Sequence, residues 1–160
     1  MKFLTIFLSF FIGLIVFMPK DNLFFTLQKE LKKENIYINS DIKSNIIDLS
    51  LSNSKVFING INLATIKQTT ILPLLVFNKI ELKNIKIDFN NLNINNLKIQ
   101  YSLLNPINII IKGKSNFATI DGFVNLKNRD MKIYLLNLTN NSIKPFLKKD
   151  KKGYFYAQKF

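Results

Sequence analysis

The chain has no cysteine, no histidine and no tryptophan, and it has one arginine, Arg129. Without cysteine it forms no disulfide and has no thiolate for catalysis or for zinc. Without histidine it lacks the commonest general base near neutral pH and the usual ligand of transition metals. Its 10 acidic residues are dispersed singly, with no metal-ligand spacing among them. We therefore expect no enzyme activity, no cofactor and no metal site.

Acidic residues are scarce beside the 23 basic ones, which leaves a formal net charge of +13. A charge of this size attracts nucleic acid, anionic lipid headgroups or acidic protein surfaces. Nucleic-acid recognition favours the arginine guanidinium, whereas here the basic residues are lysines scattered along the chain. These features argue against nucleic acid as the partner, and a membrane-tethered nucleic-acid binder is kept only as an alternative.

The longest apolar run begins at Phe3 and ends at Met18, just before Pro19. Such surface is buried only by a membrane or by another chain. A cleaved signal peptide would end in small residues, whereas Val16 and Phe17 are bulky. We therefore predict an uncleaved signal-anchor transmembrane helix over residues 1–19. Its anchor side chains are Phe3, Leu4, Ile6, Phe7, Leu8, Phe10, Phe11, Ile12, Leu14, Ile15, Val16, Phe17 and Met18.

The apolar run is short for a membrane span, because it covers about 24 Å of a hydrocarbon core of about 30 Å. The helix must thin the bilayer or recruit apolar residues beyond Pro19. Its orientation is open, since only Lys2 precedes the run whereas Lys20, Lys29 and Lys32 follow it. Taken literally, the positive-inside rule keeps the body of the protein in the cytoplasm. Lysine is abundant throughout this chain, which weakens that rule here.

Residues 20–34 predict a second, amphipathic helix. Leu23, Phe24, Leu27 and Leu31 share one helical face, with lysine and glutamate opposite. Either Asp21 or Asn22 is expected to cap its first turn. Two roles stay open: the helix closes one end of the domain, or it lies in the lipid interface.

From residue 35 to residue 160 the apolar residues alternate with polar ones, which predicts a β domain. The dipeptide Asn59-Gly60 is the strongest hairpin signal. Pro73 indicates a bend or a short helix, and Asn105-Pro106 indicates a break. Expected strands are 36–38, 47–51, 56–58, 61–66, 107–112, 117–126, 131–138 and 153–160, with a helical turn at 143–147 and a charged loop at 148–152.

Within residues 78–104 the alternation changes phase wherever an extra polar residue, often asparagine, intervenes. Bulges would re-aim the side chains and curve a sheet, whereas a β-helix would turn corners at these points. We predict a mainly β fold with a curved antiparallel sheet, half-barrel or groove-like, and one greasy face. Such a face must curl on itself, pair with a protein or hold an acyl chain. A small sandwich with an isoleucine-rich core is the alternative.

Residues 115–135 read SNFATIDGFVNLKNRDMKIYL. This segment resembles the closing segment of the GspN-like branch of the AsmA-related envelope proteins. The shared pattern is a strand that begins with phenylalanine, an I-x-G-x-V-x-L strand, an arginine-containing turn and a last apolar strand. Segments 72–75 and 80–87 are similar to the way AsmA-like domains enter their curved sheet. The matching positions of the closing segment are Phe117, Ile120, Gly122, Val124, Leu126 and Arg129.

The resemblance implies a single-pass protein of the bacterial inner membrane, with its C-terminal domain in the periplasm. It implies a structural or interaction accessory of a type II secretion-like or DNA-uptake apparatus, with secretion or competence proteins as partners. It also implies kinship with groove-shaped lipid-handling proteins. A lipid-binding or lipid-transport module that takes phospholipid is therefore the alternative function.

The same residues also have structural interpretations. Gly122 inside a strand indicates a bulge or a close backbone approach, and Gly113 is expected to end the preceding strand. Arg129 is expected to pair with Asp121 or Asp130 and so to pin a hairpin.

Overall fold

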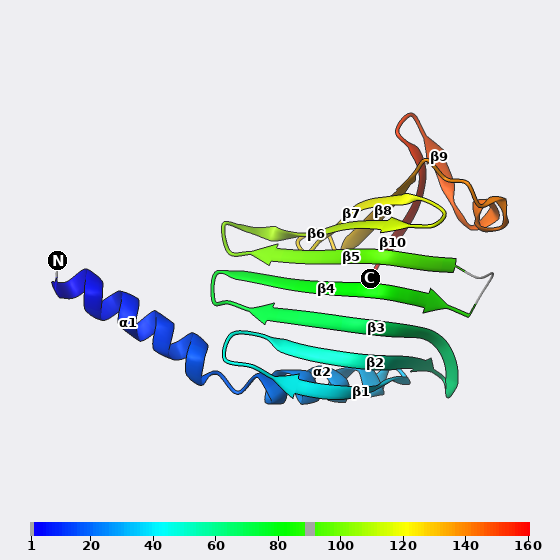
Figure 1. Ribbon diagram of the computed structural model, residues 1–160. Coiled ribbons are helices and arrows are strands. Elements are labelled where there is room, and N and C mark those ends of the chain that lie inside the picture. Colours follow the sequence, from blue (N-terminus) through cyan, green and yellow to red (C-terminus); the bar gives the residue numbers. More distant parts are fainter. Residues whose placement is uncertain (1, 89–91) are drawn as a thin grey trace.

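The computed structural model describes residues 2–88 and 92–160, except for the side chains of the predicted anchor residues Phe3, Leu4 and Leu8. Two helices precede a single β-sheet of ten strands (Figure 1). The helices are α1 (Lys2–Phe17) and α2 (Lys20–Lys33), and a 3₁₀ segment (Asn141–Phe146) follows the eighth strand. The strands are β1 (Ile36–Ser44), β2 (Leu49–Ile58), β3 (Ile61–Pro73), β4 (Phe77–Ile87), β5 (Leu92–Ser102), β6 (Asn105–Ser115), β7 (Thr119–Asn125), β8 (Asp130–Leu136), β9 (Lys148–Asp150) and β10 (Gly153–Lys159).

The sheet is open and antiparallel, with the order β1-β2-β3-β4-β5-β6-β7-β8-β10-β9. The predicted mainly β class, the antiparallel sheet and the helix before it are therefore confirmed. The sandwich and the β-helix are wrong, because all ten strands form one sheet, in which β1 to β8 pair in sequence order and β10 lies between β8 and β9. Cross-strand pairing joined segments that looked separate in the sequence, such as 47–51 and 56–58, into long strands.

Several predicted boundaries need correction. Asn105 and Pro106 lie inside β6 rather than in a break, and the turn before them is at residues 103–104. Residues 148–150 of the predicted charged loop form β9, which pairs with β10. Pro73 ends β3 and is followed by a bend at residues 75–76, so the predicted bend is confirmed and the short helix is not. The N-cap residue of α2 is Pro19, without a side-chain cap, so Asp21 and Asn22 lie within the first turn.

A row of extra residues crosses the middle of the sheet. Asn53, Lys67, Asn84 and Asn95 lie opposite one another in β2 to β5, and the outer partners β1 and β6 lack the corresponding residue. Asn53 and Asn84 have φ angles of +52° and +53°, a left-handed conformation that asparagine tolerates better than most residues. These residues explain the phase changes in the sequence as irregularities of one sheet.

The row keeps apolar side chains on one face. On β4, Ile80 and Leu82 precede Asn84, and Ile85 and Ile87 follow it. Because side chains alternate between faces, an uninterrupted strand would place the second pair opposite to the first. The left-handed conformation at Asn84 absorbs the extra residue and keeps both pairs on one face, where Ile85 is 7% exposed.

Helix α2 covers this apolar face near β1 and β2. Phe24 is buried against Leu49 and Leu51, with Ile38 and Ile71 packed around them. Burial of a phenylalanine side chain stabilises a fold by about 2–3 kcal/mol. The packing supports a domain-closing role for α2, although Phe25 on the same helix is 54% exposed.

Candidate functional site

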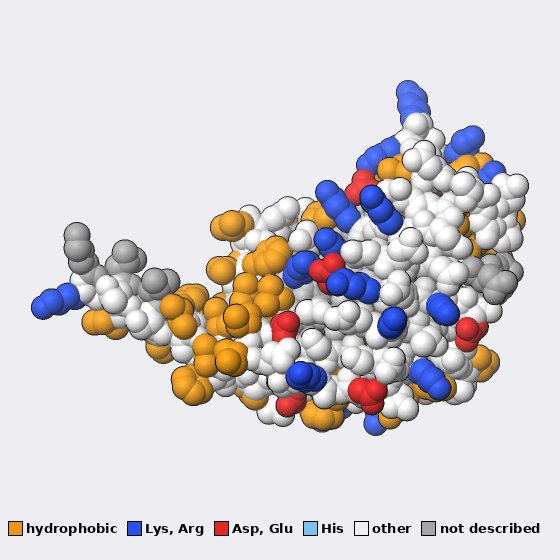
Figure 2. Space-filling model, in the orientation of Figure 1, with side chains coloured by type: hydrophobic (Ala, Val, Ile, Leu, Met, Phe, Trp, Pro, Cys, Tyr) orange, Lys and Arg blue, Asp and Glu red, His pale blue; other side chains and the backbone are white. Residues whose placement is uncertain are grey.

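Helix α1 projects beyond the sheet with large apolar side chains in the open (Figures 1 and 2). Phe17 is 85% exposed, Ile6 68% and Phe10 62%. The backbone of every predicted anchor residue except Met18 lies in α1, and Met18 lies in the break before α2. Within the described residues, neither helix alone has the length and hydropathy of a membrane span. Thr5–Phe17 and Lys20–Lys33 together meet both requirements, with a bend of 59° between them.

The joint between the two helices is closed by Lys20. Its buried ammonium group donates hydrogen bonds to the carbonyl oxygens of Ile15 (2.9 Å) and Met18 (3.3 Å). These carbonyls lie at the C-terminal end of α1, where the helix leaves acceptors unpaired and where a positive charge is favourable. Lys20 therefore acts as the C-terminal cap of the apolar helix.

The apolar face of the sheet continues past α2. Directly paired residues share a face, and one such row runs from Leu49 through Ile71, Ile80 and Ile99 to Ile111. At the other end, Leu138 and Ile143 of the segment after β8 pack on Leu92, Phe117 and Ala118.

Neither buried cluster includes the middle of the apolar face. This stretch contains Leu97, Ile99 and Tyr101 of β5 and Ile109 of β6, all of them partly buried. An apolar stretch that no helix covers is a candidate surface for a protein or a lipid. We call these residues the uncovered stretch.

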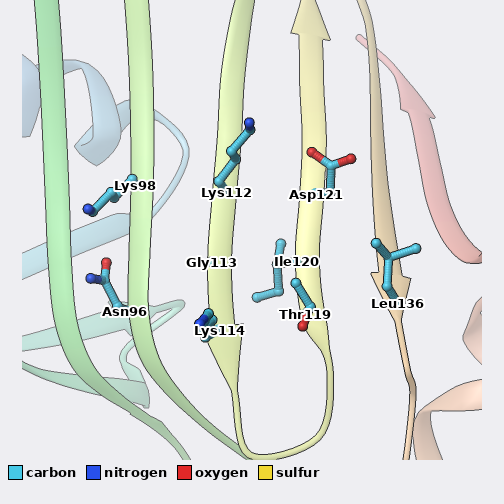
Figure 3. A pocket seen from close by; sticks show the side chains of 9 residues that line it. All are labelled: Asn96, Lys98, Lys112, Gly113, Lys114, Thr119, Ile120, Asp121 and Leu136. Atoms are coloured by element: carbon cyan, nitrogen blue, oxygen red, sulfur yellow. The ribbon is translucent and has the colours of Figure 1, made fainter.

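The opposite face of the sheet is polar, and Figure 2 shows lysine and acidic side chains scattered over it. It carries a shallow pocket of about 460 Å³ lined by residues of β5 to β8, with Lys98, Lys112 and Asp121 around it (Figure 3). Lys112 and Lys114 are exposed and make no ion pair within the described chain. The pocket is a weak anion site at most, because its basic side chains are solvated.

The acidic residues of the polar face are paired with lysine. Lys79 lies 2.9 Å from Glu81 and Lys98 lies 3.8 Å from it, and the hydrogen bond from Lys79 is the main cause of a lowered pKa for Glu81. Lys152 lies 3.1 Å from Asp121. Such ion pairs at the surface contribute little to stability.

A second polar cluster joins β8 to the β9–β10 hairpin. Asp150 accepts hydrogen bonds from Lys132 (3.1 Å) and from the Tyr134 hydroxyl (2.9 Å). The Lys132 ammonium also lies 4.0 Å from the ring centre of Phe155. Hydrogen bonds with Tyr134 and Asp150 raise the pKa of Lys132. Partial desolvation raises the pKa of Asp150, but the hydrogen bonds outweigh it and leave that pKa lowered. The cluster therefore holds the last hairpin in place.

The six positions that carry the family resemblance have structural surroundings. Phe117 and Ile120 are buried, Gly122 and Val124 lie in β7, and Leu126 and Arg129 lie in the turn to β8. A Cβ at Gly122 would lie 2.8 Å from the Lys132 carbonyl oxygen, so the predicted close backbone approach is confirmed. Gly113 lies within β6 and does not end it.

The predicted ion pair of Arg129 is wrong. Asp121 pairs with Lys152 instead, and among the described residues Arg129 makes no ion pair. Arg129 has a φ angle of +52° in the turn, and its carbonyl oxygen accepts a hydrogen bond from the Phe160 amide. Backbone geometry therefore accounts for its place in the fold.

Sequence reasoning missed the Lys20 cap and the Lys132–Asp150 cluster. The Lys20 cap was predictable, because a lysine directly follows an apolar helix. The Lys132–Asp150 cluster was not, because it depends on the pairing of β8 with β10. The described residues hold no group of three or more acidic residues that could bind a metal ion. Comparisons with known protein families, with curated proteins and with solved structures found no match.

Proposed function

We propose that this chain is a membrane-anchored envelope protein that acts as a structural or interaction accessory of a type II secretion-like or DNA-uptake apparatus. The single observation that carries the membrane part is α1, whose large apolar side chains stand in the open ahead of the sheet. Residues 1–19 enter the bacterial inner membrane once, and residues 35–160 lie in the periplasm. The apparatus itself is proposed from the family resemblance of residues 115–135.

The interaction part of the proposal rests on the uncovered stretch. Leu97, Ile99 and Tyr101 lie on the apolar face between α2 and the segment after β8, and neither covers them. A tethered domain that bears such a stretch meets its partner in the plane of the membrane, where tethering raises the effective concentration. The stretch is therefore the proposed contact with another protein of the apparatus.

Compartment is tested with reporter enzymes fused after Phe160. One reporter is active only outside the cytoplasm and the other only inside it. We expect activity from the first alone, together with retention of the fusion in membranes after an alkaline wash. Activity from the second alone would overturn the periplasmic placement, and binding of DNA that weakens steeply with salt would then favour the nucleic-acid alternative.

A second candidate function is lipid binding, because the uncovered stretch lies on a curved sheet whose apolar face would suit an acyl chain. The two functions are separated by a photo-crosslinking phenylalanine at Tyr101 in the full chain, expressed in bacteria. The matched control carries the same group at Gln100, the preceding residue on the same strand, whose side chain points to the polar face.

A protein-sized adduct from position 101 and none from position 100 supports the accessory function. An adduct of phospholipid mass from position 101 alone supports the lipid module instead. If position 101 gives no more adduct than position 100, the uncovered stretch is not a contact surface, and both functions lose their structural basis.

A further inference from the structure

The hairpin turns at one end of the sheet are unusually apolar. From β1 to β8 each strand pairs antiparallel with the next one in the sequence, so every second turn lies at the same end. One end has the turns at residues 45–48, 74–76, 103–104 and 126–129, which we call the α1-end turns. Their exposed side chains include Leu104 at 94%, Ile46 at 68% and Val76 at 52%. Leu103, Ile47 and Leu126 are also exposed, so each of these turns presents an aliphatic side chain.

The described turns at the opposite end differ in kind. Their exposed residues include Asn59, Gly60, Asn116 and Asn137. The large apolar side chains exposed near that end lie on strands rather than in the described turns: Ile61 is 64% and Leu63 40% exposed on β3, and Tyr37 is 42% exposed on β1. The described turns at the two ends thus differ in the side chains that they present.

The apolar end is also the end at which α1 joins the domain. Leu75, in the 74–76 turn, lines an apolar hollow of about 480 Å³ together with Phe10, Leu14 and Phe17 of α1. Figure 2 shows that hydrophobic side chains continue from α1 onto the adjoining end of the sheet. Successive α1-end turns stand about 10 Å apart, which is two strand spacings. The turns therefore extend the apolar surface of α1 sideways.

The length of α1 sets the depth of these turns. Its 16 residues span about 24 Å, which is less than the hydrocarbon core of about 30 Å. A short span thins the bilayer and draws the flanking structure toward the headgroups. The turns next to Phe17 would then lie in the interface, where aliphatic side chains bury their surface. Lys127 and Arg129 in the 126–129 turn would meet anionic phosphates there.

We propose that the α1-end turns form a second membrane contact, in which Leu104, Val76 and Ile46 insert into the headgroup and acyl boundary of the bilayer that α1 enters. This inference rests on the proposed membrane anchor and adds an orientation to it. The strands of β1 to β6 would stand upright on the bilayer, with both faces of the sheet accessible from the side. A tether alone would leave the domain free to tumble.

The test uses the full chain, which has no cysteine and so takes a label only where one is introduced. Three variants, Leu104→Cys, Phe10→Cys and Asn59→Cys, each carry an environment-sensitive fluorophore. They are reconstituted into vesicles of phosphatidylethanolamine and phosphatidylglycerol. Quenchers are placed at the headgroup boundary, in the middle of the acyl chains, or in the water. Position 10 reports the anchor, position 104 an α1-end turn, and position 59 a turn at the opposite end.

We expect the label at position 104 to lose most of its fluorescence to the boundary quencher, the label at position 10 to the mid-chain quencher, and the label at position 59 to the aqueous quencher alone. A label at position 104 that follows position 59 while position 10 stays in lipid overturns the second contact and leaves the anchor standing. A label at position 10 that is quenched only from water overturns the anchor, and the second contact with it.

Discussion

Insertion of one serine after Asn84 is expected to prevent folding or to lower the free energy of unfolding by about 4 kcal/mol. The insertion adds a second extra residue to β4, so that either Ile85 and Ile87 or Ile80 and Leu82 must turn to the polar face. Exposure of two isoleucine-sized side chains costs about 2 kcal/mol each. The free energy is measured by urea unfolding in detergent micelles, followed through tyrosine fluorescence and circular dichroism.

The control for this insertion is Asn84→Gly, which keeps the number of residues and accepts the φ angle of +53°. It should unfold within about 1 kcal/mol of the unchanged protein. Asn84→Val also keeps the number but places a β-branched residue in a left-handed conformation, at a cost of about 1–2 kcal/mol. Equal unfolding midpoints for the insertion and for the glycine variant would contradict the role of the row in keeping the apolar face in phase.

The row of extra residues shows which part of the fold can be predicted from the sequence. Alternation is a local property, so the phase change around Asn84 and the need for an irregularity were both predictable. That the irregularities line up across β2 to β5 was not, because their alignment depends on the register of strands far apart in the chain. The same limit explains the sandwich alternative, since a local pattern does not say how many sheets the strands form.

The candidate surfaces were also predictable from the sequence only in part. The exposure of α1 follows from an apolar run that no partner run in the sequence could cover, and it was predictable. The pairing expected for Arg129 failed, because nearness in sequence to Asp130 says little about where a side chain in a tight turn points. The shared apolar character of the α1-end turns was not predictable either. Leu104 and Ile46 lie in separate loops, and only the antiparallel order brings their turns to one end.

Glycine occupies two points at which neighbouring strands approach closely. A Cβ at Gly122 would lie 2.8 Å from the Lys132 carbonyl oxygen and 3.0 Å from the Ile133 Cα, both of them backbone atoms of β8. A Cβ at Gly113 would lie 2.7 Å from the Asn96 carbonyl oxygen in β5. Strands approach this closely where a sheet coils strongly, and glycine alone leaves the room.

Gly122→Val is therefore expected to lower the free energy of unfolding by about 3 kcal/mol, because rigid backbone cannot move aside for the added side chain. The same urea unfolding measures it, with Gly13→Ala as the matched control. Gly13 has open space around its Cβ position, and alanine favours a helix by up to about 1 kcal/mol over glycine. The control should unfold no earlier than the unchanged protein.

The Gly122 variant also connects the fold to the proposed function. If β7 and β8 must move apart to admit valine, the sheet flattens beside the uncovered stretch, and the photo-crosslink from position 101 should fall more than the folded fraction does. A protein-sized adduct that is lost in this way indicates a partner fitted to the curved face. An unchanged unfolding midpoint for Gly122→Val would show that β7 and β8 have room for a side chain at this position.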